Sequence, residues 1–330
     1  MLWGAVPREG RRRLIRVPLA ACENYKRESG METVVEVSHI AYSDESYYTN
    51  DRYRSVAVVT FESANKERFS NSFRQILDSS QVSEFKWNKL RQARERFAAI
   101  KLIDEVISLA QKKLLRIDVL IWDTQDSRHQ VEGRDDVANL QRMYYHLFKN
   151  VLKTRWSAQS TWFLFPDENS ALDWQSVQDF LDTAGLSFQI SSGLFDNKPF
   201  SIRLSRDFQI MGITEISSAK EVICQVADLF AGMGAYSHSS FAKYLEWEER
   251  ENGQMRLFSE TPAENQKFTN SEKERFIIMK HLDNSCKKNK FRVSLKNGKG
   301  FKTFDPRFPI NFWMYEPQNA KDKAPTKNGG

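Results

Sequence analysis

Apolar residues at two different spacings predict strands and helices between residues 34 and 243. Two runs rich in β-branched and aromatic residues, Val34–Ser43 and Tyr53–Phe61, have the composition of strands. The first carries apolar residues on both faces, as a central strand does. The turn cluster Thr49-Asn50-Asp51 separates the two runs, and strands joined by so short a connection must be antiparallel.

Helical and strand-like patterns alternate through the rest of this block. Between Leu90 and Leu114, apolar residues repeat at intervals of three and four, the spacing of one helix face. Strands that alternate with helices favour parallel crossover connections. We therefore expect an α/β fold whose mixed sheet is antiparallel in its first strands, parallel in its later strands and flanked by helices. The elements predicted after the second strand are helices 64–77, 90–114, 137–153, 174–183 and 220–236 and strands 117–122, 161–165, 187–190 and 208–216.

The two ends of the chain differ from this block. Residues 1–33 carry Arg11-Arg12-Arg13 and no sustained periodicity, which predicts a basic, disordered leader with too short an apolar stretch for a secretory signal. Met31 directly precedes the first strand pattern and suggests a start of translation there. Residues 244–330 form a C-terminal extension with a disordered tail from Pro317. Its basic stretch comprises Lys287, Lys288, Lys290, Arg292, Lys296, Lys299 and Lys302.

The amino-acid composition excludes several classes of protein. Hydrophobic residues make up 40% of the 330 and include 23 Phe, so the chain can bury a core, whereas no apolar run approaches the roughly 18–20 residues that span a bilayer. Three distant cysteines form no disulfide or zinc pattern, which fits the reducing cytoplasm. The 14 glycines include no phosphate-binding loop. A net charge of +6 is compatible with a polyanionic partner.

Three predicted strands run into acidic residues. Asp44-Glu45-Ser46 follows the first strand, Asp123 follows strand 117–122, and Asp167-Glu168 follows strand 161–165. Carboxylates at the carboxyl ends of strands can converge, and they raise one another's pKa unless a cation neutralises them. Mg²⁺ suits such hard oxygen ligands, and two ions can activate water for phosphodiester hydrolysis. The alternative is that these Asp and Ser residues only begin turns and cap helices.

The last predicted helix, 220–236, carries a second stripe beside its apolar one. The stripe is polar at its first three positions and small at its last two, and comprises Glu221, Gln225, Asp228, Gly232 and Ala235. Another surface can therefore approach closely while Asp228 reaches toward it. An ordinary solvent-facing stripe is the alternative, although such stripes favour Lys and Glu over Gly.

The segment Glu84-Phe85-Lys86-Trp87 lies between the two early helices. In an extended segment, residues two apart point to the same side, so that Glu84 could ligate a metal while Lys86 meets a phosphate. A surface ion pair between these two residues is the alternative.

These motifs, in this order, resemble the domain-of-unknown-function-3800 family, whose members are similar to ribonuclease H-like nucleases. The matching residues are Asp44-Glu45-Ser46, Glu84-Phe85-Lys86-Trp87, Asp167-Glu168 and Gln225-Val226-Ala227-Asp228, within residues 34–243. The resemblance implies a ribonuclease H-like sheet in which Asp44 is the main ligand of Mg²⁺ or Mn²⁺. Glu84, Asp167 and Asp228 would complete the site, with Asp123 as an alternative to Asp167. Tyr47 departs from the family pattern, which often has Gly there, and a third antiparallel strand is not evident unless 82–87 supplies it.

The function that the resemblance implies is a metal-dependent nuclease acting on RNA or DNA, with metal-activated water as nucleophile. The expected substrate-binding residues are Glu45, Ser46, Lys86, Lys89, Arg91, Arg94 and Gln225. The solvent side of helix 90–114 and the basic stretch would contact phosphates, which makes affinity fall with salt. Two alternatives stay open: a catalytically inactive module that binds nucleic acid or a protein partner, and a phosphohydrolase of small phosphates.

Overall fold

A computed structural model describes residues 36–46, 52–126, 135–191, 201–251 and 268–316 of the chain. The predicted leader, Met31, the Thr49-Asn50-Asp51 turn and the tail from Pro317 lie outside these residues. Within the described ranges, no helix combines the length and the apolar character needed to cross a bilayer.

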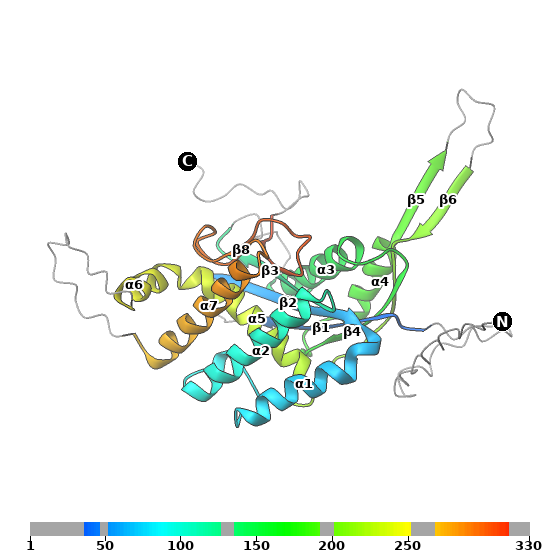
Figure 1. The fold of residues 1–330 in the computed structure, drawn as a ribbon. Helices are drawn as coiled ribbons and strands as arrows, with labels where there is room; N and C mark the ends of the chain where they lie inside the picture. Colours follow the sequence, from blue (N-terminus) through cyan, green and yellow to red (C-terminus); the bar gives the residue numbers. More distant parts are fainter. Residues whose placement is uncertain (1–35, 47–51, 127–134, 192–200, 252–267, 317–330) are drawn as a thin grey trace, which may run out of the picture.

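A six-stranded mixed sheet forms the middle of the molecule (Figure 1). In spatial order its strands are β10 (Ile310–Met314), β3 (Leu115–Asp123), β2 (Tyr53–Glu62), β1 (His39–Ser46), β4 (Ser160–Pro166) and β7 (Phe208–Ile213). β2 is antiparallel to β1 and to β3, whereas the other neighbouring strands are parallel. The predicted mixed α/β sheet is confirmed, and β3 is the third antiparallel strand that the sequence pattern did not make evident.

The direction of β3 follows from the two helices that connect it to β2. α1 (Lys66–Ser79) and α2 (Ala93–Gln111) lie antiparallel, because Ser72 contacts Glu105 while Ser79 contacts Lys101. The pair returns the chain to the end of the sheet at which β2 finished, so β3 runs opposite to β2. A single crossover helix would have produced the parallel connection that the sequence pattern favoured.

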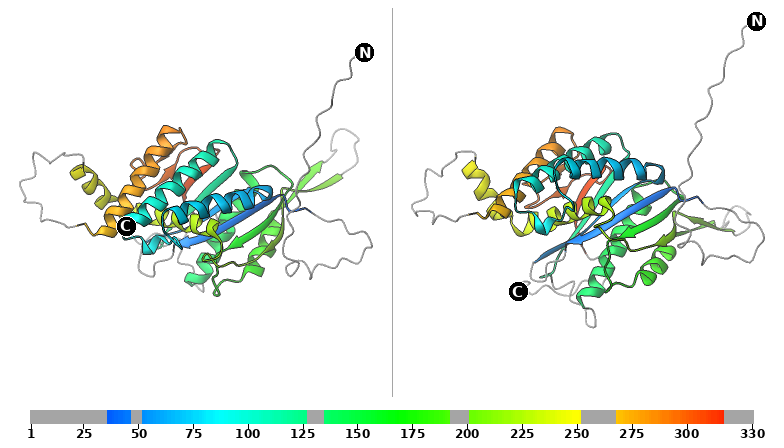
Figure 2. Two further views of the ribbon diagram at one scale, coloured as in Figure 1. Left: turned by 60° about the horizontal axis from the view of Figure 1, so that its bottom comes forward. Right: turned by 90° about the horizontal axis from the view of Figure 1, so that it is seen from below.

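Helices cover both faces of the sheet (Figure 2). α1, α2, α5 (Val222–Ser239), α6 (Phe241–Glu251) and α7 (Asn270–Lys288) contribute to one hydrophobic cluster, and α3 (Asp136–Thr154) and α4 (Trp174–Ala184) to the other. Successive residues of β1 alternate between the two faces, so that Tyr42 belongs to the first cluster and Ala41 to the second. By the same alternation, Asp44 faces α5 and Glu45 faces α3.

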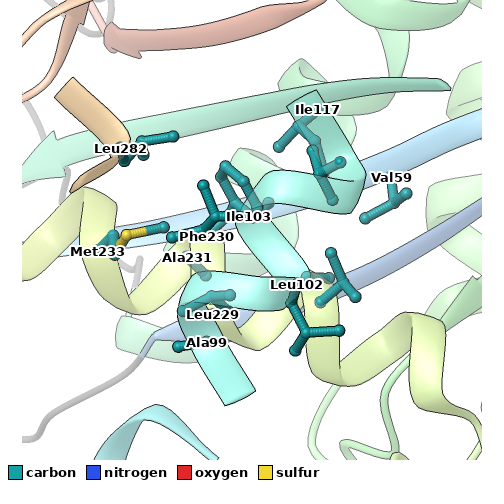
Figure 3. Packing of buried hydrophobic residues seen from close by; sticks show 14 of the residues in the cluster. Val59, Ala99, Leu102, Ile103, Ile117, Leu229, Phe230, Ala231, Met233 and Leu282 are labelled. Carbon is teal, nitrogen blue, oxygen red and sulfur yellow. The ribbon is translucent and has the colours of Figure 1, made fainter. Parts of the chain in front are cut away.

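α5 is the central helix of the first face (Figure 3). Residues 222–227 and 229–235 are all buried, as expected for a helix enclosed between a sheet and other helices. Figure 3 shows Leu229 and Phe230 of α5 beside Ala99 and Ile103 of α2, with Leu282 of α7 close by. This packing fixes the position of the polar residues that α5 carries toward β1.

Two differences from the predicted boundaries affect candidate site residues. Asp44 and Glu45 lie within β1 rather than after it, because the pairing with β2 continues as far as Ser46. The helix expected from Leu90 begins at Ala93, where Gln92 and Glu95 form a capping box. Lys89 and Arg91 therefore precede α2.

The C-terminal extension is part of the same core. Phe276 of α7 packs with Tyr244 and Trp247 of α6 in the first cluster, and β10 pairs with β3 at the edge of the sheet. α7 was not predicted, although the capping box of Thr269 and Glu272 marks its start in the sequence. The described residues also form two two-stranded sheets, β5 (Leu186–Ser191) with β6 (Ser201–Arg206) and β8 (Val293–Ser294) with β9 (Lys302–Thr303), and two short 3-10 helices, Ser63–Asn65 and Trp87–Lys89.

Buried charged residues fasten this extension to the sheet. Asp118 of β3 is fully buried, accepts a hydrogen bond from Asn311 Nδ2 of β10 (2.9 Å) and lies 3.6 Å from Arg116 Nε. Burial raises the pKa of Asp118, and the guanidinium groups of Arg116 and Arg155 oppose that rise. Arg116 also donates to the carbonyl oxygens of residues 306, 307 and 308, at 3.2, 3.3 and 3.0 Å.

Candidate functional site

Asp44 points from β1 toward α5, and only 5% of its surface is exposed. Its Oδ1 accepts a hydrogen bond from the backbone N–H of Glu45 (2.7 Å), whereas its buried Oδ2 accepts none. Burial raises the pKa of Asp44 well above its ordinary value; the Asp228 and Asp167 carboxylates raise it further. Leaving a buried carboxylate oxygen without a donor costs free energy. Such an atom marks a position that favours a cation.

The ammonium group of Lys86 supplies that cation. Its Nζ lies 3.7 Å from Asp44 Oδ2 and 3.2 Å from Asp167 Oδ2. Burial by itself would lower the pKa of Lys86, but the carboxylates of Asp44, Asp228 and Asp167 outweigh burial and raise the pKa above its ordinary value. We call these three aspartates the acidic cluster; Lys86 is its counterion in this structure.

The polar stripe of α5 binds the segment that carries Lys86. Gln225 Oε1 accepts a hydrogen bond from the backbone N–H of Phe85 (2.8 Å), and Asp228 Oδ2 accepts one from that of Trp87 (2.6 Å). One turn further along, Gly232 lies against the Trp87 ring. The prediction that another surface approaches α5 along this stripe is confirmed. Gln225, a predicted substrate-binding residue, holds the Lys86 segment in place.

Gly232→Ala is expected to destabilise the protein by about 1–3 kcal/mol, because an added Cβ would lie 2.1 Å from Cγ of Trp87. Urea unfolding followed by circular dichroism measures this change. In protein that carries Trp87→Ala, the ring is gone and Gly232→Ala causes no clash. The stability lost in the double variant should therefore be less than the sum of the two single losses. Additive losses would show that Gly232 and Trp87 do not interact.

Asp228, like Asp167, is half-buried. Burial raises its pKa to about 6, although the hydrogen bond from Trp87 and the charge of Lys86 both favour its ionised form. Glu84 and Asp167 raise it as well. Glu84 forms an ion pair with Lys89 (3.2 Å), a residue with 67% of its side chain exposed. Glu84 therefore lies at the outer rim of the site, near Asp228.

Asp167 follows β4 and is fixed by two backbone contacts. Its own N–H donates to the carbonyl oxygen of Ser43 (2.8 Å), which extends the pairing of β4 with β1. Its Oδ1 accepts a hydrogen bond from the backbone N–H of Ser218 (2.8 Å), whose carbonyl oxygen accepts one from Gln225 Nε2 (2.7 Å). Ser218 was not among the predicted site residues, although it stands just before the α5 stripe.

Glu45 and Ser46, which were expected to bind substrate, are placed differently from Asp44. The Glu45 carboxylate lies on the α3 face, where it accepts hydrogen bonds from the Tyr144 hydroxyl and from Asn169 Nδ2 (2.8 Å for the latter). Burial raises the pKa of Glu45. Ser46 is buried at the end of β1. Tyr144 and Asn169 had no sequence signal beyond a hydroxyl on an apolar helix and an amide after Asp167-Glu168.

Asp123 lies apart from the acidic cluster. It ends β3, which β2 separates from β1, and its carboxylate accepts hydrogen bonds from Arg52 Nε and Nη2 (2.9 and 2.6 Å to Oδ2). β4 is the parallel neighbour of β1. The geometry therefore brings Asp167, and not Asp123, together with Asp44.

The basic side chains near α2 and in the C-terminal basic stretch differ in exposure and in pairing. Lys89 and Arg91 are exposed in the segment before α2, and Arg94 in its first turn pairs with the adjacent Glu95 (2.8 Å). Arg96, by contrast, is only 20% exposed and pairs with Glu274 of α7 (2.8 Å), so it connects two helices. In the C-terminal basic stretch, Lys287 pairs with Asp283 and Lys296 with Glu248.

The acidic cluster has the donor chemistry that Mg²⁺ or Mn²⁺ requires. Its carboxylate oxygens are hard ligands, and Asp44 Oδ2 lacks a hydrogen-bond donor. In the described part of the chain, no three His, Cys, Asp or Glu side chains are grouped so as to hold a metal ion by themselves. Mg²⁺ commonly uses only one or two carboxylates, with water and substrate phosphate as the other ligands. The residues therefore fit a metal site that substrate helps to complete.

Comparison with known proteins identifies two relatives, both from Methanothermobacter thermautotrophicus. "Uncharacterized protein ORF2′" is 38% identical over 294 residues, and "Uncharacterized protein ORF2" is 37% identical over 295 residues. Each alignment covers 87% of this chain and 97% of the relative. No protein-family model matches the chain. At this identity and coverage, the chain belongs to the family of the Methanothermobacter ORF2 and ORF2′ proteins.

Proposed function

We propose that this protein is a divalent-metal-dependent nuclease that hydrolyses phosphodiester bonds in RNA or DNA. The observation that carries the proposal is the buried Asp44 carboxylate, with an oxygen that accepts no hydrogen bond, facing Asp167, Asp228 and the Lys86 ammonium group. A buried carboxylate beside two half-buried ones opposes folding, and such a group is typical of catalytic sites.

We also propose that the sheet is ribonuclease H-like and that the chain is related to the domain-of-unknown-function-3800 proteins. The antiparallel strands β1, β2 and β3 and the parallel strands β4 and β7 support this assignment. So does the position of the motifs, with Asp44 on β1, Asp167 after β4 and Asp228 on α5.

Asp44 would hold the metal, together with Asp167 or Asp228. A bound Mg²⁺ or Mn²⁺ would activate water and stabilise the leaving oxygen. The chain's own residues do the rest. Gln225 and the Asp228–Trp87 hydrogen bond fix the Lys86 segment, and Ser218 orients Asp167. Lys89, which pairs with Glu84, and the exposed Arg91 would contact phosphates, and such contacts make binding weaken with salt.

A catalytically inactive module that binds nucleic acid or a protein partner is the alternative. It needs no metal, and the loss of the Asp44 charge would leave its binding unchanged. The raised pKa values of Asp44 and Asp228 favour the nuclease, because a binding surface gains nothing from buried, mutually repelling carboxylates.

Asp44→Asn is expected to lower the cleavage rate by about 100-fold or more, since a metal contributes several kcal/mol to catalysis of this kind. The assay uses labelled RNA, DNA and RNA–DNA hybrid with Mg²⁺, Mn²⁺ or EDTA. Asp123→Asn is the matched control, because it removes a strand-end carboxylate outside the cluster. Metal-independent cleavage, or equal rates for wild type and Asp44→Asn, would contradict the proposal. Cleavage of mononucleotides alone would favour a small-phosphate hydrolase.

A further inference from the structure

We infer that Lys86 exchanges partners during substrate binding, so that the acidic cluster takes up a divalent metal together with a nucleic-acid phosphate rather than before it. In the free protein the Lys86 ammonium would neutralise Asp44 and Asp167, and in the complex it would neutralise the phosphate. This inference rests on the proposed nuclease function and names how its metal site is filled.

The first argument is position. Lys86 Nζ lies within 4 Å of one carboxylate oxygen of Asp44 and one of Asp167. The Asp44 oxygen that it approaches is the one that accepts no hydrogen bond. A divalent ion that used Asp44 and Asp167 as ligands would meet the ammonium group at close range, and the two cations would repel each other. Metal and Lys86 therefore compete for the same carboxylates.

The second argument is that the Lys86 side chain can leave the acidic cluster without movement of the backbone. The backbone of the Lys86 segment is held by Gln225 and Asp228, whereas the ammonium group at the end of the Lys86 side chain contacts Asp44 and Asp167. That side chain is 20% exposed, and the exposed Lys89 follows in the same segment. The flexible four-carbon stem of a lysine can turn toward the rim while the backbone stays in place. A phosphate at the rim would then attract it.

The third argument is the number of ligands. The described residues include no set of three His, Cys, Asp or Glu side chains that could hold a metal ion alone. A phosphate oxygen would supply a further ligand and would also draw Lys86 away. Metal and nucleic acid must then bind with positive coupling, and each must raise the affinity of the other by the same factor.

Mn²⁺ titration of the whole protein tests the inference, with and without a hydrolysis-resistant phosphorothioate oligonucleotide. Wild-type protein should bind Mn²⁺ at least tenfold more tightly when the oligonucleotide is present. Lys86→Met keeps the length of the stem and removes the charge, so its affinity for Mn²⁺ without oligonucleotide should rise at least tenfold. Lys101→Met, at an exposed lysine of α2 whose ammonium group contacts Ser79 and Ser80, should behave as wild type.

Two results would overturn the inference: Mn²⁺ binding by wild type that does not depend on the oligonucleotide, or Lys86→Met protein that binds Mn²⁺ no more tightly than wild type. Circular dichroism with and without Mn²⁺ shows whether the variant is folded, and if it is not, the wild-type titration decides. Because no cleavage is measured, the outcome is separate from that of the nuclease assay. Coupling without any cleavage would contradict only the proposed activity.

Discussion

Asp228→Asn is expected to stabilise the protein at pH 8 by about 2 kcal/mol while abolishing metal-dependent cleavage. In the folded protein the pKa of Asp228 is raised to about 6, mainly by burial, from an ordinary value of 3.8. The ionised carboxylate therefore opposes folding above pH 6. Asn removes the charge and keeps an oxygen that can accept the Trp87 N–H, and Lys86 retains Asp44 and Asp167 as partners.

The same pKa gives the direction of the pH dependence. Between about pH 6 and pH 4, folded Asp228 binds its proton more tightly than unfolded Asp228, so its contribution to stability increases as the pH falls through this window. The difference in unfolding free energy between wild type and Asp228→Asn should therefore shrink from pH 8 to pH 4. Urea unfolding at a series of pH values measures it, with Asp123→Asn as a surface control. A constant difference would show that Asp228 is not the titrating group.

Arg116→Met is expected to destabilise the protein by about 3 kcal/mol, because it removes the nearer of two guanidinium groups from a buried carboxylate and leaves Asp118 with Arg155 at 4.0 Å and with Asn311. Asp118 has no exposed surface, and Arg116 also holds three carbonyl oxygens of the segment that leads into β10. Arg307→Met is the matched control, because this arginine of the same segment is 87% exposed and pairs with Asp305. Its loss should change stability by at most about 1 kcal/mol.

A second substitution, at Asp118, separates the effect of the buried charge from that of the hydrogen bonds lost with Arg116. In the double variant Arg116→Met, Asp118→Asn the buried carboxylate is gone, so a large part of the loss should be recovered. Thermal and urea unfolding of wild type, the two single variants and the double variant measure the four stabilities that this comparison needs. No recovery would show that the hydrogen bonds from Arg116 to the carbonyl oxygens, and not the charge of Asp118, account for the loss.

Local sequence patterns predicted the elements that build the site. The small and polar stripe of α5 pointed to a close-packed partner, and Gln225, Asp228 and Gly232 all contact the Glu84–Trp87 segment. The stripe depends on residues within one helix, so a periodic pattern is enough to reveal it. The mixed sheet was predicted from the short connection between the first two strands and from the alternation of later strands with helices.

Features that depend on the path of the chain were not predictable in this way. The choice between Asp123 and Asp167 depends on which strand lies next to β1, and the antiparallel pair α1 and α2 decides it by returning the chain to form β3. The hydroxyl of Tyr144 reaches Glu45 across 99 residues of sequence. No local pattern in α3 distinguishes this tyrosine from an ordinary core residue.

The pairing of β10 with β3 has a consequence for synthesis of the chain. Asp118 and Asn311, neighbours across this pair, are 193 residues apart in sequence. At about 5–20 residues per second, β3 leaves the ribosome about 10–40 s before the strand that covers it. During this interval the β3 edge, whose residues 115–122 are all buried in the folded protein, is open to pairing with other chains, a known route to aggregation. The nascent protein should therefore depend on chaperones until its last strand has emerged.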